Sequence, residues 1–304
     1  MTGSGVEWAR NPAQRGVARR RAIGAALALG GGALLSLAGI TLRHMDSAGG
    51  WQILFYRSLT FLVVVAAYLA IRYRTRVVDA FVRVGKPGIV VALSLGLGSA
   101  CYVFALLLTT IANALFIVSA APFMTAILGW LWLRERVTPT TWVAMMFALA
   151  GIALMVVNGV QSGRLLGNVV ALGAPVSFAV MLVALRSAGD RDMIPAICLA
   201  GVVSAGLGLA MMDSLAISRH DLLLCLFLGV VQYTGGFVLL ALGARYLPAA
   251  EVALLALSEI VLAPIWVWIG VGEVPTVFTL VGGGIVLAAV VAHSAMGMRS
   301  PEAP

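Results

Sequence analysis

Apolar residues along the chain fall into ten runs, which are separated by short segments that hold most of the charged residues. A helix rises 1.5 Å per residue, so about 20 residues cross the ~30 Å hydrocarbon core of a bilayer. Most of the runs are long enough, and we expect each of them to form a membrane-spanning helix. The runs are Ala22–Leu42, Trp51–Ile71, Gly88–Leu108, Ala112–Leu133, Thr141–Val157, Leu165–Leu185, Ile194–Met212, Leu222–Gly243, Ala249–Gly270 and Val277–Ala295.

The first five runs and the last five repeat one another. Gly32–Ala38 (GALLSLA) is echoed by Gly173–Ala179 (GAPVSFA), and Glu135–Thr138 (ERVT) after the fourth run is echoed by Glu273–Thr276 (EVPT) after the ninth. In both of the latter segments the threonine is placed to cap the next helix. Because five is an odd number of spans, the second half must enter the membrane from the opposite side. The sequence therefore predicts an all-α membrane protein of ten transmembrane helices, arranged as two inverted five-helix repeats.

Basic residues are divided unevenly between the two sides of the membrane that this arrangement defines. With a cytoplasmic N-terminus, sixteen lie in cytoplasmic segments, three (Arg43, Arg164 and Arg219) lie on the opposite side, and Arg57 lies within a run. Cytoplasmic loops normally carry an excess of Lys and Arg, so we expect both termini in the cytoplasm. The sixteen are Arg10, Arg15, Arg19, Arg20, Arg21, Arg72, Arg74, Arg76, Arg83, Lys86, Arg134, Arg136, Arg186, Arg191, Arg245 and Arg299.

The pattern also predicts how the chain is divided. Residues 1–18 are polar and are expected to form a disordered cytoplasmic N-terminus, and residues 299–304 a cytoplasmic tail. The first repeat is predicted over residues 19–158 and the second over 165–298, and the halves join near Asn158–Arg164. The one sizeable loop, Arg72–Pro87, is expected to hold a short amphipathic helix.

Composition supports a membrane protein and excludes several other classes. Hydrophobic residues make up 62% of the chain, charged residues 11%, and the mean hydropathy is +1.05; a water-soluble protein would have too little polar surface to cover such a core. The net charge of +8 arises from arginines in short loops. We interpret them as topology signals and contacts to anionic lipid, and expect no nucleic-acid partner.

The chain lacks the signatures of metal or catalytic chemistry. Its three cysteines, Cys101, Cys198 and Cys225, all fall within apolar runs, and no His/Cys/carboxylate spacing suggests a metal site. We find no H-E-x-x-H, G-x-S-x-G or G-x-x-x-x-G-K-[ST] motif. We therefore expect no metal, no cofactor and no enzymatic activity. The absence of a nucleotide-binding motif also means that any solute transport by this chain must be facilitated or coupled to an ion gradient.

Charged residues inside the runs are costly in hydrocarbon and are therefore informative. Glu259 lies near the middle of the ninth run, where it either contacts a substrate amine or couples a proton, or else forms a structural hydrogen bond to a neighbouring helix. Glu251 lies in the first turn of the same helix, where the helix dipole favours an acid and a structural role. For Arg57, about six residues into its run, we also favour a structural or gating role over binding of a substrate carboxylate.

Four uncharged polar residues are further candidates for a cavity lining. Tyr102 belongs to a stripe of small and polar residues with Ser94 and Gly98, and Gln232 to a similar stripe in the eighth run. Such stripes serve either as packing seams or as cavity walls, but bulky polar groups at mid-span suit a wall. Ser36 and Ser177 occupy equivalent positions in the two repeats, near the expected two-fold axis; each could instead bond to its own helix.

Several of these features resemble one known family. The ten runs in two halves, the arginine of Phe55-Tyr56-Arg57, and the segment Leu128–Thr138 (LGWLWLRERVT) with its echo ending in Gly272–Thr276 (GEVPT) are similar to the EamA-type drug/metabolite transporter superfamily. Within it the chain most resembles the YddG-type amino-acid exporters of bacterial inner membranes. That resemblance implies export of aromatic and other neutral amino acids through a central cavity.

We therefore hypothesise a multi-pass transporter of a bacterial inner membrane that exports amino acids by alternating access. Its expected partners are these small molecules and the lipid bilayer, with the chain acting as a monomer. Ser36, Tyr102, Ser177, Gln232 and Glu259 are the predicted substrate-binding residues. The alternatives are export of another small metabolite or drug-like cation, and a non-transporting membrane scaffold or sensor.

Overall fold

We describe the fold from a computed structural model, which covers residues 12–108, 114, 117–156, 165–272 and 277–299. The described residues form helices and connecting segments and contain no β-strand, so the predicted all-α class is confirmed. The helices are α1 (Pro12–Leu35), α2 (Leu37–Arg43), α3 (Gly50–Tyr73), η2 (Arg74–Arg76), α4 (Val77–Arg83), α5 (Gly85–Leu108), α7 (Ala121–Leu133), α8 (Pro139–Val156), α9 (Leu165–Ser187), α10 (Ile194–Met211), α11 (Arg219–Phe227), η3 (Leu228–Gly235), α12 (Gly236–Gly243), α13 (Ala249–Ala256), α14 (Ser258–Val271) and α15 (Val277–Arg299).

Seven helical segments are long and apolar enough to cross a membrane: 16–43, 50–83, 85–108, 169–187, 194–211, 219–243 and 249–270. Three shorter apolar helices, Ala121–Leu133, Pro139–Leu154 and Leu280–His293, fall on the remaining three apolar runs. Helices form over these runs because hydrocarbon offers no partner to the backbone, whose polar groups must bond within the segment. The chain is a multi-pass membrane protein, and the count of ten spans stays a prediction.

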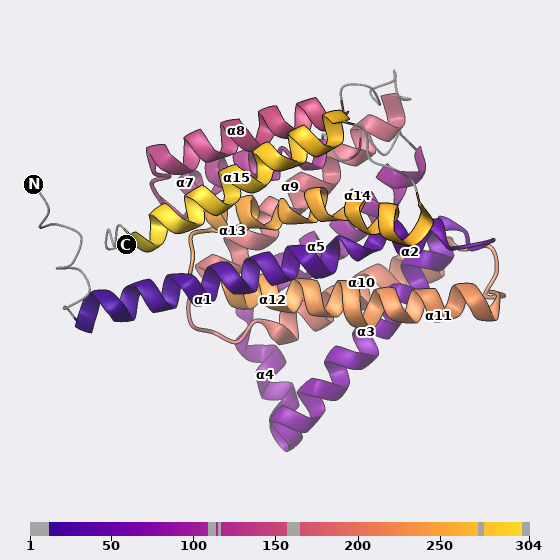
Figure 1. The fold of residues 1–304 in the computed structure, drawn as a ribbon. Coiled ribbons are helices and arrows are strands. Elements are labelled where there is room, and N and C mark those ends of the chain that lie inside the picture. Colours follow the sequence, from indigo (N-terminus) through magenta and orange to yellow (C-terminus); the bar gives the residue numbers. More distant parts are fainter. Residues whose placement is uncertain (1–11, 109–113, 115–116, 157–164, 273–276, 300–304) are drawn as a thin grey trace, which may run out of the picture.

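The long helices of the first half pack mainly against helices of the second half. α3 contacts α10, α5 contacts both α9 and α10, α1 contacts α12, and α8 contacts α15. Figure 1 shows α8 and α15 running side by side along one edge of the bundle. It also shows that α1 begins and α15 ends at the same end of the molecule. One extended core of buried apolar residues joins the two halves.

Several long helices are interrupted near their middle. α1 gives way to α2 at Ser36, and α13 gives way to α14 at Leu257. Between α11 and α12 the eight residues of η3 form a π-helix, in which the Thr234 hydroxyl donates to the carbonyl of Gly229, five residues earlier. α9 contains Pro175 in its interior, where proline removes one backbone donor. Such irregular turns leave backbone groups and side chains free to face an interior space.

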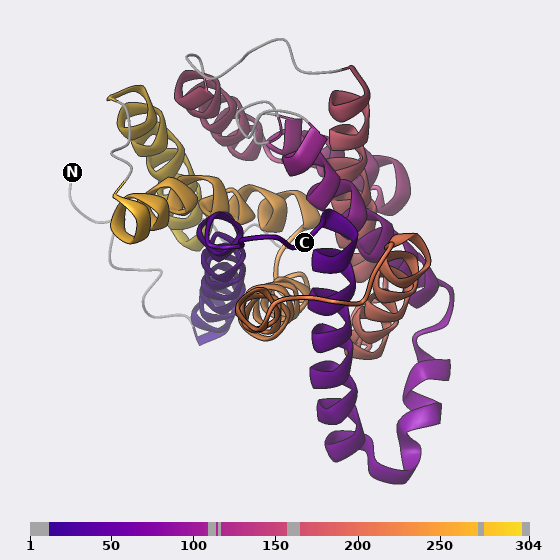
Figure 2. The same ribbon diagram turned by 90° about the vertical axis from the view of Figure 1, so that its right-hand side faces the viewer.

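The end of α3 and the short helix α4 project from the rest of the bundle, as Figures 1 and 2 show. A short helix in the loop Arg72–Pro87 is thus confirmed; Val78 and Val82 on it are more than 70% exposed.

The expectation for the N-terminus needs a correction. α1 begins at Pro12, so residues 12–18 are helical rather than disordered. Proline suits the first position of a helix, and the Ala, Gln and Arg residues that follow are good helix formers. At the other end of the chain, α15 extends to Arg299. The predictions for residues 1–11 and 300–304, and for the junction at 158–164, lie outside the described residues.

Candidate functional site

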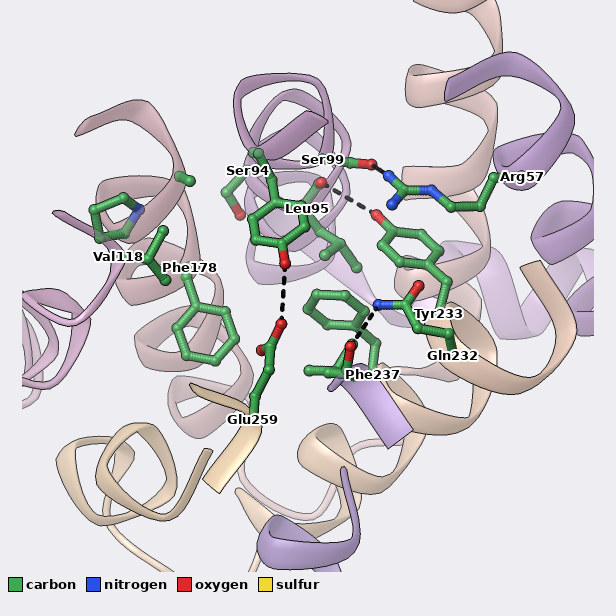
Figure 3. Close-up of a pocket in the computed structure, with 15 residues that line it drawn as sticks. Arg57, Ser94, Leu95, Ser99, Val118, Phe178, Gln232, Tyr233, Phe237 and Glu259 are labelled. Carbon is green, nitrogen blue, oxygen red and sulfur yellow. Dashed lines mark hydrogen bonds between the residues drawn. The ribbon is translucent and has the colours of Figure 1, made fainter. Parts of the chain in front are cut away.

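A cavity lies at mid-span, between helices of both halves (Figure 3). It leaves about 80 Å³ for the centres of water molecules, and one water needs roughly 10–15 Å³ of such space. It therefore holds several waters or a small solute. Its walls are mostly apolar with a few polar groups, which is the usual character of a ligand site. The lining residues are Leu35, Arg57, Ser94, Leu95, Gly98, Ser99, Tyr102, Val118, Ala174, Pro175, Phe178, Gln232, Tyr233, Phe237 and Glu259.

Glu259 is the acidic residue among those that line the cavity. It lies in the first turn of α14, directly after the break at Leu257, and its Oε1 accepts a hydrogen bond from the Tyr102 hydroxyl at 3.1 Å. The N-terminus of a helix carries a partial positive charge, so the break in this span places a carboxylate where the helix favours one. In Figure 3 a dashed line from Glu259 marks this hydrogen bond.

Arg57 provides a positive charge on the other side. Its side chain extends from α3 and is only 3% exposed. The guanidinium donates from one terminal nitrogen to the Ser99 hydroxyl and lies over the Tyr233 ring, 4.7 Å from the ring centroid. Its Nε is buried and has no hydrogen-bond partner in the described part of the chain. The sequence favoured a structural or gating role for this residue, yet it lines the cavity.

Gln232 is held by the π-helix η3 and is 2% exposed. Its Nε2 donates to the Leu35 carbonyl at 3.3 Å, at the end of α1. Its Oε1 is buried without a partner among the described residues. A buried polar atom without a partner costs free energy, so this oxygen is an unused acceptor in a residue that lines the cavity.

Aromatic rings form much of the remaining wall. Tyr233 packs edge-on against Phe237 and Phe61, with ring centroids 4.8 and 4.7 Å apart, and Phe178 lies 6.4 Å from Phe237. Our reading of the sequence did not single out Phe178, Phe237 or Ser99. The position of Phe178 next to Ser177, inside the repeated GAxxSxA segment, is the one signal that could have found it.

Ser36 and Ser177 are not among the lining residues, although the residues beside them, Leu35 and Phe178, are. Ser36 is 1% exposed; its hydroxyl donates to the Ala33 carbonyl at 2.6 Å and accepts from Trp266 Nε1 at 2.7 Å. Ser177 packs against α5, because a Cβ atom on Gly98 would lie 2.6 Å from the Ser177 Cβ. Both serines therefore contact neighbouring helices, and their predicted substrate-binding role stays a prediction.

Glu251 lies away from the cavity, in the first turn of α13. Both of its oxygens accept from Arg21 of α1 at 2.9 Å, and Nε2 of His293 on α15 lies 3.9 Å away. This cluster joins three helices at the end of the bundle where α1 begins. The geometry agrees with the structural role that we favoured for this residue.

One group of side chains in the described residues has the composition of a metal site. The ligand atoms of Asp46, His220 and Asp221 lie within 4.8 Å of one another. The buried Asp221 carboxylate, however, accepts from the backbone N–H groups of Asp46 and Ser47 at 2.9 and 3.1 Å, and His220 Nε2 lies 2.9 Å from the His44 carbonyl oxygen. These bonds tie the start of α11 to the loop after α2, and we interpret the group as a structural link.

Apolar helices of spanning length thus surround a small cavity that carries polar and charged groups, which is the architecture of a membrane transporter of small solutes. The chain belongs to the EamA-like transporter family, whose model matches residues 22–157 and 165–294. Proteins of this family are transporters rather than enzymes, and the same holds for this chain. The family also favours transport over the scaffold or sensor alternative.

One known protein is similar to this chain in sequence and one solved structure is similar in fold, both at low identity. Human solute carrier family 35 member G1 is 28% identical over 198 residues, which are 59% of this chain and 54% of that protein. The matched part thus spans about half the length of this curated relative. A crystal structure of another protein aligns with a TM-score of 0.75 over 92% of this chain and 99% of its own, at 16% identity. At that identity the likeness shows the fold alone.

Proposed function

We propose that this protein exports neutral amino acids, aromatic ones included, across a bacterial inner membrane. The observation that carries the proposal is the position of Glu259, a carboxylate inside a mid-span cavity and beside the Tyr102 hydroxyl. A carboxylate in this setting suits the ammonium group of an amino acid. The Gln232 amide offers a further hydrogen bond, and the rings of Phe178 and Phe237 suit an apolar side chain.

The proposed architecture is two inverted five-helix repeats with both termini in the cytoplasm. The family model matches the two halves separately. A two-fold axis that relates each span to the fifth one after it would exchange the α5–α9 contact with the α12–α1 contact, and would map α3–α10 and α8–α15 onto themselves. All of these contacts are present. The excess of basic residues on one side supports the cytoplasmic termini.

Alternating access is the proposed mode of transport, and the interrupted helices support it. The breaks at Ser36 and Leu257 and the π-helix η3 lie at mid-span, next to the cavity. Local changes in backbone angles at such points let one part of a helix move while the rest stays packed. Opening on one side of the cavity can then be accompanied by closing on the other.

Transport in liposomes tests the proposal directly. Purified protein is reconstituted and preloaded with an unlabelled amino acid, and uptake of labelled phenylalanine, leucine and other neutral amino acids by counterflow is measured. We expect counterflow for at least one neutral amino acid. No exchange of any member of the panel, by protein that remains folded, would remove the proposal.

The Glu259→Gln variant tests the observation on which the proposal rests. Gln keeps the size of the side chain but loses the charge, so amino-acid exchange should fall by roughly 100-fold, the effect of removing a buried charged hydrogen-bond partner. Glu135→Gln is the matched control, since Glu135 pairs with Arg186 at the bundle surface; its transport should stay near wild type. If Glu259 also couples a proton, the variant should lose any dependence of transport on a pH gradient. Wild-type transport by Glu259→Gln would contradict the assignment.

Export of a drug-like cation is the second candidate, and one observation favours it. Glu259 lies in a cavity that also contains the rings of Tyr102, Phe178 and Phe237, and a carboxylate with aromatic faces binds organic cations well. The liposome assay separates the candidates when lipophilic amines are added to the panel. Exchange of the amines without exchange of amino acids would favour the cation exporter.

A further inference from the structure

The Arg57 guanidinium is a buried charge in the wall of the cavity. In the described ranges, no Asp or Glu oxygen lies within 4.0 Å of it, and the carboxylate of the cavity, Glu259, bonds to Tyr102 instead. Removing an isolated cation from water costs several kcal/mol, and arginine in a membrane normally faces a partner or a wet cavity. Among the described residues, the cavity wall therefore holds a cation that no carboxylate neutralises.

The contacts of Arg57 stabilise it only in part. The face of the guanidinium rests on the Tyr233 ring, and one terminal nitrogen donates to Ser99. A cation–π contact and a neutral hydroxyl do not neutralise the charge, and the buried Nε has no partner in the described part of the chain. Guanidinium presents several N–H donors in one plane, which match the two oxygens of a carboxylate. A ligand carboxylate would supply both the missing charge and the missing acceptor.

A second residue of the cavity wall has a buried polar atom without a partner in the described part of the chain. Gln232, the residue before Tyr233 in η3, has its Oε1 buried without a partner in the same set of residues. An amide oxygen accepts hydrogen bonds, and among the described residues this one accepts none, from Arg57 or from any other donor. It is free to accept from a donor on the same ligand, such as an ammonium group.

We propose that Arg57, with Ser99 and the Tyr233 ring, forms a subsite for the carboxylate of the substrate. Figure 3 shows Arg57 and Glu259 on opposite sides of the cavity, each bonded to a hydroxyl group and not to the other. With Glu259 as the ammonium site, the cavity then selects amino-acid zwitterions against the corresponding amines. The inference rests on the proposed function and replaces the structural role favoured for Arg57 from the sequence.

Binding of matched compounds to the purified wild-type protein tests the subsite. Each set shares one side chain: phenylalanine with phenethylamine and 3-phenylpropionate, and leucine with 3-methylbutylamine and 4-methylpentanoate. Dissociation constants are measured by calorimetry. We expect the zwitterion to bind at least roughly tenfold more tightly than the amine, since it alone supplies the charged acceptor for Arg57.

Two variants and one control then assign the effect to the residue. In Arg57→Gln the preference for zwitterion over amine should fall to roughly two-fold or less, because the cation that reads the carboxylate is gone. Arg57→Lys keeps the charge but loses the planar donors, and should retain part of the preference. Arg72→Gln removes a cation from the exposed end of the same helix and should leave the preference unchanged.

The outcomes separate this inference from the proposed function. Equal binding of zwitterion and amine by the wild type, or an unchanged preference in Arg57→Gln, would overturn the carboxylate subsite while leaving amino-acid export open to the liposome assay. Binding of the two carboxylic acids but of neither zwitterion, lost in Arg57→Gln, would support the subsite and overturn amino-acid export. Failure of all six compounds to bind would overturn the subsite. If Arg57→Gln does not fold, the wild-type and Arg57→Lys measurements decide.

Discussion

The two halves of the ninth apolar run behave differently although both are strongly hydrophobic. Every residue of α13 is buried, whereas α14 exposes Trp268 (47%) and Ile269 (71%) near its end. Four of the eight residues of α13 are alanine, which lets neighbouring helices approach on all sides, while α14 carries bulky tryptophans. In a bilayer, lipid tails are as apolar as a protein core. In this run the size of the residues, more than their hydrophobicity, therefore distinguishes the segment that faces protein from the segment that faces lipid.

The junction between α13 and α14 is itself tightly packed. A Cβ atom on Gly32 of α1 would overlap the Ser258 hydroxyl and would lie 3.0 Å from the Ala256 carbonyl oxygen. Glycine at this position thus lets α1 approach the backbone at the junction of α13 and α14. Glu259, which lines the cavity, follows one residue after Ser258. The closely packed half and the cavity-lining half meet at this contact.

Replacing Glu251 should have the largest effect on stability, because it removes the ionic centre of the α13 half. Glu251→Ala leaves Arg21 and His293 without their shared carboxylate, and we expect a loss of about 2 kcal/mol, less than for a fully buried pair because Arg21 reaches solvent. Thermal unfolding in detergent measures it. Arg72→Ala, which breaks a more exposed pair with Asp192, should cost under about 1 kcal/mol. Equal losses in the two variants would contradict the contrast.

Adding one methyl group at the junction should have an intermediate effect. Gly32→Ala forces α1 away from Ser258 and Ala256, and overpacking of this kind costs about 1–2 kcal/mol. Because the shift reaches the start of α14, amino-acid exchange should fall as well. Gly39→Ala is the control, since its new methyl group meets no atom within 4 Å. Wild-type unfolding and exchange in Gly32→Ala would show that the contact tolerates movement.

The smallest effect is expected in the α14 half. Trp266→Phe removes the indole donor that bonds to Ser36 at 2.7 Å, while Ser36 keeps its bond to Ala33. A hydrogen bond between membrane helices contributes about 0.6 kcal/mol on average, so the unfolding temperature should fall only slightly. Trp268→Phe, on the exposed side of the same helix, should leave that temperature unchanged. A loss as large as that of Glu251→Ala would show that α14 is held as firmly as α13.

The helical architecture could be predicted from the sequence because hydrocarbon forces each apolar run to satisfy its own backbone. The interruptions could not, since Ser36, Leu257 and η3 lie in runs whose composition does not change. The position of a residue along a run gives its depth in the membrane but not the direction in which its side chain points.

The site illustrates that limit. The sequence predicts that bulky polar residues near the middle of an apolar run line a cavity, and Tyr102, Gln232 and Glu259 do line it. Ser36 and Ser177 were chosen because they are equivalent in the two repeats, but the residues next to them line the cavity instead. A step of one residue along an α-helix turns the side chain by about 100°, so an error of one residue changes what the side chain faces. The depth of Arg57 along its run could be predicted, whereas its lack of an ionic partner among the described residues depends on which side chains the other helices place beside it.

The wide turns of η3 have a consequence for the direction in which α12 faces. A π-helix advances less around its axis per residue than an α-helix, so eight residues wound this way displace the azimuth of everything that follows. Phe237, two residues beyond η3, reaches the cavity in this orientation. α-Helical winding over the same stretch would aim that ring elsewhere, so the shape of the cavity depends on the rotation per residue in η3 as well as on residue identity.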